Sequence, residues 1–319
     1  MPFDFSLVSA PFRMQPGLRR IAPGASQLTP NLPGSRHLRE KMAVLASHPA
    51  QAIASTPAFD ALPVLRTIAG EAMREAAPAF TVDESAADGI EIHAPLLGWS
   101  LRSGEPRGNG DPAIGALLDT LAPPLRPIAL LCLAFGEDFA VIDGASTTIP
   151  WLAVCLPSRW APEDKVGRRF AEVHAPVADN AVILAASDSL ARLVTGDERW
   201  ERFVWTISAD PHLHQHPARS SAPWPSDADA NALAALASFR SERQTFIPIG
   251  GARQAVFTIH VQSVPLEQAL TTRDAATRVH DAVASMSPAV LAYRGLDGAR
   301  GRLLDWLARR AAALPRATG

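Results

Sequence analysis

The sequence predicts one α+β domain, in which a mostly antiparallel β-sheet is combined with helices before, within and after it. Strand-like apolar runs joined by turn residues recur in the middle and in the last third of the chain. Segments with apolar residues at helical spacing lie between and outside these runs. We find no internal repeat and no linker long enough to require a second domain, so a single domain is expected over residues 1–319.

The expected elements follow from these patterns. Helices are expected at 37–46, 60–75, 114–121, 162–171, 182–193, 231–237, 274–286 and 302–314. Strands are expected at 128–135, 139–143 and 151–156 as an antiparallel meander, at 203–208, and at 244–249 and 255–264 as a hairpin around Gly250–Gly251. A short hairpin is expected around 89–99, and loops at 103–112 and 210–228.

Composition narrows the class of protein. Hydrophobic residues make up 47 % and charged residues 19 %, which supports a packed core. The formal charge of -2 argues against nucleic acid or an anionic membrane as an obligate partner. The longest apolar stretch, 128–135, is too short to span a bilayer, and the first residues lack the pattern of a secretory signal. We therefore expect a cytoplasmic protein, with Cys132 and Cys155 as reduced core thiols rather than a disulfide.

Common enzyme motifs are missing from the sequence. It contains no G-x-x-x-x-G-K-[ST], no strand-linked G-x-G-x-x-G, no G-x-S-x-G and no H-E-x-x-H. Nucleotide-binding, α/β-hydrolase and zinc-peptidase functions therefore lose their usual support.

A histidine cluster is the most conspicuous candidate for metal binding. His212, His214 and His216 would share one face of an extended chain, where three imidazoles can converge on a metal. However, Pro211 and Pro217 flank the cluster, and no neighbouring acidic residue or cysteine completes a familiar site. We expect a solvated loop here, with a metal site as the alternative.

His174 lies in a different setting, at the end of the stretch 154–177. This stretch leaves an apolar run, turns, passes through a charged segment and ends just before Pro176. One interpretation is a histidine at the edge of the core, bonded to backbone. The other is a neutral imidazole that acts as a ligand or a general base.

Charged residues also precede an expected strand. Arg240, Glu242 and Arg243 lie directly before it and form either a solvated face or a structural ion pair. If they faced inward they would need partners, because an unpaired buried charge is costly. They would then bind an anionic ligand or build a polar pocket, and Arg202 and Trp205 beside another strand could contribute to it.

Several ordered motifs together resemble one known family. They are V-C-L-P-S-R-W at 154–160, K-V-G-R at 165–168, H-A-P-V at 174–177, R-S-E-R-Q-T-F at 240–246, A-V-F-T-I-H at 255–260 and Y-R-G-L at 293–296. In this order they are similar to the haem-dependent oxidative N-demethylase α-subunit-like family, over about residues 10–310.

The resemblance implies a PAS-like fold, an antiparallel sheet wrapped by helices that holds haem b. It implies O2-dependent oxidative N-demethylation of a small secondary amine such as dimethylamine. Electrons would come from NADPH through separate subunits that carry FMN and a 2Fe-2S cluster, and a tetrahydrofolate-binding partner would take up formaldehyde. Two alternatives remain: a haem-binding sensor or gas-binding protein without turnover, and a family member that binds no cofactor.

The resemblance also implies roles for individual residues. His174 is expected as the iron ligand, Glu242 and Gln244 as contacts for the amine and oxygen, and Trp205 as a wall of the cavity. The residues expected to bind the cofactor, in addition to His174, are Arg159, Arg202, Arg240 and Arg243.

The chain also departs from the family pattern. At residues 202–205 the family pattern is R-x-N-W, and this chain has Val204 in place of the asparagine. Pro16 and Leu156 also differ from the residues that the family pattern leads us to expect. Loss of a polar group at position 204 would change the substrate or abolish catalysis.

Overall fold

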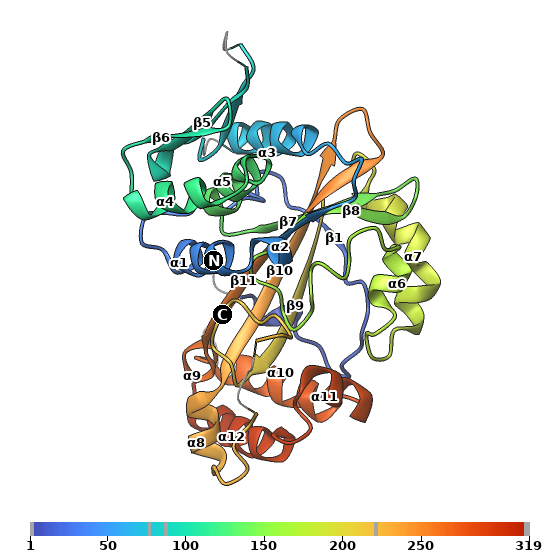
Figure 1. Cartoon of the computed structure of the whole chain (residues 1–319). Helices are drawn as coiled ribbons and strands as arrows, with labels where there is room; N and C mark the ends of the chain where they lie inside the picture. Colours follow the sequence, from blue (N-terminus) through green and yellow to red (C-terminus); the bar gives the residue numbers. More distant parts are fainter. Residues whose placement is uncertain (1–2, 76–77, 86–88, 220–222, 316–319) are drawn as a thin grey trace.

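The computed structural model of the chain describes residues 3–75, 78–85, 89–219 and 223–315. It contains two antiparallel sheets surrounded by helices (Figure 1). The sequence expectation of a mixed α+β fold with antiparallel sheet is thereby confirmed.

The larger sheet has the strand order β1-β9-β10-β11-β7-β8-β2, and every neighbouring pair is antiparallel. Its strands are β1 (Arg19–Arg20), β2 (Ile53–Ser55), β7 (Asp138–Asp143), β8 (Thr148–Ala153), β9 (Trp200–Ser208), β10 (Ser238–Ile249) and β11 (Gln254–Pro265). The smaller sheet is a meander of β3 (Thr81–Asp83), β4 (Glu91–Ala94), β5 (Trp99–Arg102) and β6 (Glu105–Gly108).

The helices form three groups around the larger sheet (Figure 1). The first lies with the small sheet and consists of α1 (Arg36–Ser47), α2 (Pro49–Ala52), α3 (Leu62–Arg74), α4 (Pro112–Thr120) and α5 (Arg126–Ala134). The second lies to one side and consists of α6 (Phe170–His174) and α7 (Ala181–Val194). The third lies at the opposite end and consists of α8 (Ala230–Leu236), α9 (Leu266–Ala269), α10 (Arg273–Ala284), α11 (Pro288–Arg294) and α12 (Arg300–Ala313).

Strand register divides the central residues between two faces of the sheet. Glu242 pairs with Val204, and Gln244 pairs with Arg202, so these four side chains share one face. Phe170 of α6 packs on this side of the sheet against a cluster that includes Phe246, Ile142 and Ala255. We call it the α6 face.

The opposite side of the sheet carries the alternate residues of the same strands. Ser241 pairs with Trp205, and Arg243 pairs with Phe203. Trp205 packs in a buried cluster with Val279 and other residues of α10 and α12. We call this side the α10 face.

Two predicted elements are wrong in type or position. Residues 128–134 of the run expected as a strand belong to α5, in which every residue from Ile128 to Ala134 is buried, and Phe135 follows the helix in an extended conformation. A helix buried on all sides shows no apolar periodicity, so a short apolar run does not distinguish it from a strand. The run is also rich in leucine and alanine, which favour helix. The expected meander is therefore reduced to the β7–β8 hairpin.

The helix expected at 162–171 begins later, as α6 at Phe170. Lys165 N donates to Pro162 O in a turn, and Gly167 adopts a left-handed φ of 76°, which interrupts any helix. Part of the loop expected at 103–112 is strand β6. The long β10–β11 hairpin is confirmed, and Cys132 and Cys155 are buried and unbridged, as expected.

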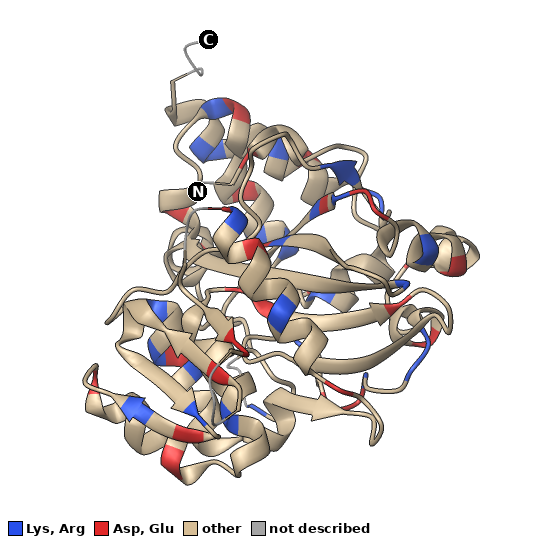
Figure 2. Cartoon of the chain, turned by 90° about the horizontal axis from the view of Figure 1, so that it is seen from above, with Lys and Arg blue, Asp and Glu red and all other residues tan. Residues whose placement is uncertain are grey.

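Charge is spread over the molecule rather than gathered. Figure 2 shows lysine and arginine segments next to aspartate and glutamate segments in both sheets and in the helices. Among the described residues, no helix is long and apolar enough to cross a membrane.

Candidate functional site

His174 is the last residue of α6 and is half-buried. Its Nδ1 donates to the carbonyl oxygen of Phe170 at 2.8 Å, and the two rings lie 4.2 Å apart. This bond selects the tautomer whose Nε2 carries the lone pair, and Nε2 has no hydrogen-bond partner in the described part of the chain. Burial lowers the pKa of His174, and the nearby charges of Arg202 and Lys165 lower it further. The imidazole is therefore neutral at pH 7 and able to act as a nitrogen ligand.

Arg202 lies on β9 on the same face and is also half-buried. Its Nε is closed off from solvent without a hydrogen-bond partner, and its guanidinium forms no ion pair with the residues that the structure describes. Burial lowers its pKa, against a weaker opposing effect of Glu242. Because a buried cation without a counter-anion is costly, this position fits an anionic group of a ligand.

Glu242 and Gln244 lie on β10 and face the same way as Arg202. Gln244 Nε2 donates to Glu242 Oε2 at 2.6 Å. The hydroxyl of Ser158, in the turn after β8, donates to Glu242 Oε1. Each oxygen of the buried carboxylate thus accepts one protein hydrogen bond.

Arg240 lies on the α6 face as well, but its contacts are within the protein. Its side chain is 1 % exposed. Nε donates to Ser158 Oγ at 2.8 Å, and the two terminal nitrogens donate to carbonyl oxygens that include those of His212 and Leu213 at 3.0 and 2.8 Å. These bonds tie the loop after β9 to the turn after β8.

Arg159 is exposed at the rim of this region. It has a left-handed φ of 63°, and its Nη1 donates to the carbonyl oxygen of Arg294 at 2.9 Å. With Trp224, Asp297 and other residues, it lines a cavity of about 540 Å³.

Two of the residues expected in the same pocket lie on the α10 face. Trp205 stacks on Phe239 at 5.8 Å. Arg243 forms an ion pair with Glu201 at 2.9 Å. The sheet separates both from Glu242, because successive side chains of a strand point to opposite faces. Residues that are neighbours along the strand therefore do not all line one pocket.

His212 is exposed, as expected for a solvated loop, but the other two histidines of the cluster are not. His214 and His216 are buried. His214 Nδ1 bonds the carbonyl oxygen of Cys155 at 2.7 Å, and His216 Nε2 lies 3.1 Å from a carboxylate oxygen of Glu163. Glu40 on α1 accepts from the backbone amides of residues 213 and 214, and with the carbonyl contacts of Arg240 this draws the loop inward.

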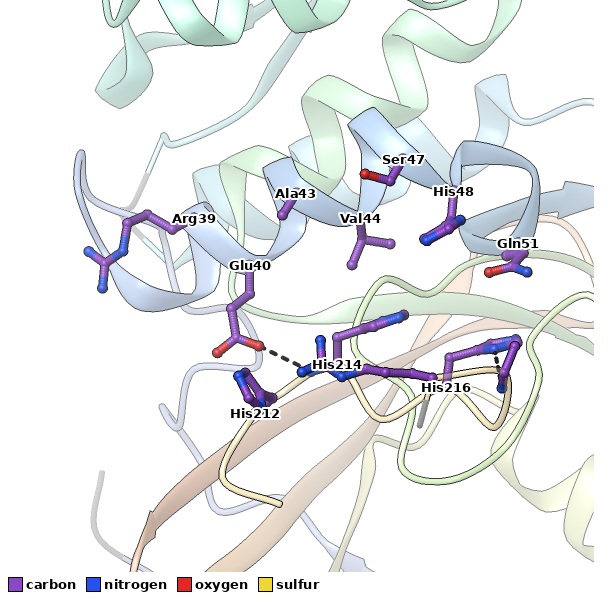
Figure 3. A pocket seen from close by; sticks show the side chains of 12 residues that line it. Arg39, Glu40, Ala43, Val44, Ser47, His48, Gln51, His212, His214 and His216 are labelled. Atoms are coloured by element: carbon purple, nitrogen blue, oxygen red, sulfur yellow. Dashed lines mark hydrogen bonds between the residues drawn. The ribbon is translucent and has the colours of Figure 1, made fainter. Parts of the chain in front are cut away.

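Figure 3 shows the resulting cavity, of about 450 Å³, with α1 residues facing the loop histidines. His48 and Glu40 lie on one wall, and His212, His214 and His216 lie on the other. Within the described ranges, no three histidine, cysteine or acidic side chains are arranged to hold a metal ion.

Ser158 is the residue of this region that sequence reasoning missed. It belongs to the motif V-C-L-P-S-R-W, which drew attention only through its arginine and tryptophan. Its partners Arg240 and Glu242 lie 82 and 84 residues away along the chain, so only the fold brings them together.

The α6 face therefore presents a neutral imidazole and an unpaired guanidinium near a hydrogen-bonded carboxylate. A neutral imidazole is a nitrogen ligand for a metal, and a guanidinium binds anionic groups. The sequence profile of the family described as haem-dependent oxidative N-demethylase, alpha subunit-like, matches residues 36–304. The match covers most of the 319 residues, and the chain belongs to this family.

Proposed function

We propose that the chain is the haem-binding subunit of an oxidative N-demethylase. In this proposal, strands β7 to β11 with α6 and α7 form a PAS-like unit, and haem b binds on the α6 face. The observation that carries the proposal is the pair His174 and Arg202, which lie on the same side of the sheet. His174 Nε2 and Arg202 Nε have no hydrogen-bond partner among the described residues, and the imidazole is neutral. The family match supports the choice of haem over other metal-bearing ligands.

The residues fit the chemistry of this group. A b-type haem offers an iron that takes a neutral nitrogen and propionates that take guanidinium groups. We assign His174 to the iron and Arg202 to a propionate, with Arg159 at the rim as a second candidate. Arg240 and Arg243 are engaged by protein acceptors, so their contacts favour structural roles.

When bound, the haem supplies the activation of O2 and the oxidation. The protein supplies the binding of the amine. Glu242 can accept N–H bonds from a protonated secondary amine, and it is the group that can take its proton at Oε1 or Oε2. Val204, which pairs directly with Glu242 on the same face, would contact a methyl group. Valine at 204 thus favours N-alkyl substituents over polar ones.

The proposed substrate class is a small secondary amine, of which dimethylamine is the simplest. One amine, one O2, two electrons and two protons yield a primary amine, formaldehyde and water. The α-subunit-like family suggests a multi-subunit oxidative enzyme. We propose that the electrons come from NADPH through subunits with FMN and a 2Fe-2S cluster, and that a tetrahydrofolate-binding partner takes up formaldehyde.

The test is formaldehyde production by the haem-loaded full chain, supplied with a ferredoxin-type reductase system, O2 and dimethylamine. Tetramethylammonium is the matched control ligand, since it carries the charge without an N–H group. Amine-dependent formaldehyde supports the enzyme. Haem binding without any amine-dependent product supports the sensor or gas-binding alternative. Absence of a Soret band after reconstitution refutes both.

A further inference from the structure

We infer that Ser158 is a positioning residue, which orients the carboxylate of Glu242 toward the cationic group of the substrate. The inference rests on the proposed function and adds a residue to it. It comes from a chain of hydrogen bonds that runs from Arg240 through Ser158 to Glu242 and ends at Gln244.

This chain of hydrogen bonds begins at Arg240, whose guanidinium is held in place by backbone carbonyl groups. The guanidinium of Arg240 donates from Nη2 to the carbonyl oxygens of Leu156 and Leu213, at 3.2 and 2.8 Å. The loop that supplies one of these acceptors is itself held, because Glu40 Oε2 accepts from the backbone amides of Leu213 and His214 at 2.8 and 3.1 Å. The histidine loop therefore serves as a support for Arg240.

Ser158 is held by its backbone as well as by its side chain. It forms a parallel bridge with Gln215, whose amide donates to Pro157 O at 3.0 Å and whose carbonyl accepts from Arg159 N at 2.8 Å. A hydroxyl carries a single proton. Because Arg240 Nε donates to Ser158 Oγ, that proton is directed to Glu242 Oε1.

The result is a carboxylate with both oxygens held. Ser158 binds Oε1 and Gln244 binds Oε2, so the group cannot rotate without losing one of the two bonds. Each oxygen keeps further acceptor capacity. A protonated secondary amine has two N–H groups, and a carboxylate fixed in this way can receive them in one orientation. Loss of the Ser158 bond would free the carboxylate and weaken recognition of the cation.

The test uses the full chain loaded with haem and the variants Ser158→Ala and Ser158→Thr. Dimethylammonium is titrated, and its Kd is read from the change in haem absorbance, with KM and kcat measured in parallel. Ser158→Ala is expected to raise Kd and KM about tenfold, since one charge-assisted hydrogen bond to the carboxylate is lost. Ser158→Thr keeps the hydroxyl and is expected to restore both values to within about twofold.

Two controls separate positioning from general damage. Carbon monoxide, a neutral iron ligand, is expected to bind wild type and Ser158→Ala equally. Ser187→Ala removes the hydroxyl of a buried serine that, among the described residues, donates to Ile183 O within α7, and this variant is expected to leave amine affinity unchanged. If Ser158→Ala does not fold, Ser158→Cys keeps the volume with a weaker donor and is expected to show the same selective loss.

The inference is overturned if Ser158→Ala binds the amine as tightly as wild type, if carbon monoxide binding falls in parallel, or if threonine fails to restore amine affinity. In these cases the proposed function stands. A wild-type chain that takes up no haem, or whose haem does not respond to the amine, overturns the proposed function and the inference together.

Discussion

Lys41 and Asp138 form an ion pair in which both side chains are fully buried, and Lys41→Met should destabilise the protein strongly. Nζ lies 3.1 Å from Asp138 Oδ1 and donates to the carbonyl oxygen of Phe135 at 3.0 Å. Removing one partner of a buried pair leaves the other charge uncompensated, at a cost of about 3–5 kcal/mol. Asp138 keeps two backbone donors, the amides of Cys155 and Leu156 at 3.0 and 2.7 Å. We therefore expect Lys41→Met to lower the free energy of unfolding by about 3 kcal/mol, the lower end of this range.

The assay is thermal and urea unfolding followed by circular dichroism. A loss of about 3 kcal/mol corresponds to a Tm lower by about 4–5 °C in a chain of 319 residues. The matched control is Lys165→Met, the same substitution at a half-buried lysine whose side chain forms no hydrogen bond or ion pair with the described residues. This variant is expected to change stability by less than about 0.5 kcal/mol. A loss below about 1 kcal/mol for Lys41→Met, or one equal to that of the control, would refute the reasoning.

The pH dependence of this pair has a definite sign. Burial acts to lower the pKa of Lys41, but Asp138 and the neighbouring thiols outweigh it, so the pKa is raised above 10.5. A raised folded pKa gives stability that is present below the unfolded value and lost as pH rises through the folded value. The difference between wild type and Lys41→Met should therefore be constant from pH 6 to 9.

Two further predictions concern other parts of the core. Gly115→Ala should lower the free energy of unfolding by about 1–3 kcal/mol, because the added Cβ would collide with the ring of Trp99. Gly70→Ala adds a Cβ to a helix where nothing lies within 4 Å, and it should raise the free energy of unfolding by up to about 1 kcal/mol. Urea midpoints of the two variants measure the difference. Burial and the nearby His260 lower the pKa of His37 to about 4 in the folded state. Between about pH 6.5 and 4 the histidine is therefore protonated in the unfolded state but not in the folded state, and the free energy of unfolding should fall as the pH drops through this range. His37→Gln should reduce this loss of unfolding free energy between about pH 6.5 and 4 by up to about 3 kcal/mol. If the variant loses as much stability as wild type over this range, the assignment to His37 is contradicted.

Much of the fold could be predicted from local pattern. The β10–β11 hairpin alternates around two glycines, and α10 and α12 carry clear apolar stripes. The helix α5 could not be recognised, because a segment buried on every side loses the periodicity that distinguishes helix from strand. The late start of α6 depends on the left-handed turn at Gly167, which the charged residues before it do not reveal.

The residues of the candidate site were chosen from sequence motifs, and their arrangement in space could not be predicted from those motifs. His174, Arg202 and Glu242 come from motifs, and the structure brings them to one face of the sheet. Trp205 and Arg243 come from the same motifs and lie on the other face, because strand register decides the side of each residue. Register depends on pairing across the chain, as do the contacts of Ser158 and the burial of the histidine loop.

The central claim is that His174 Nε2 binds iron, and a haem titration of His174→Ala followed by absorbance tests it most directly. Wild type should give a Soret band that saturates at one haem per chain. His174→Ala should lose or shift the band, and added imidazole should restore it. The control His280→Ala removes a histidine of α10, whose Nδ1 lies 2.9 Å from Asp281, and should match wild type. A His174→Ala spectrum identical to that of wild type would contradict the claim.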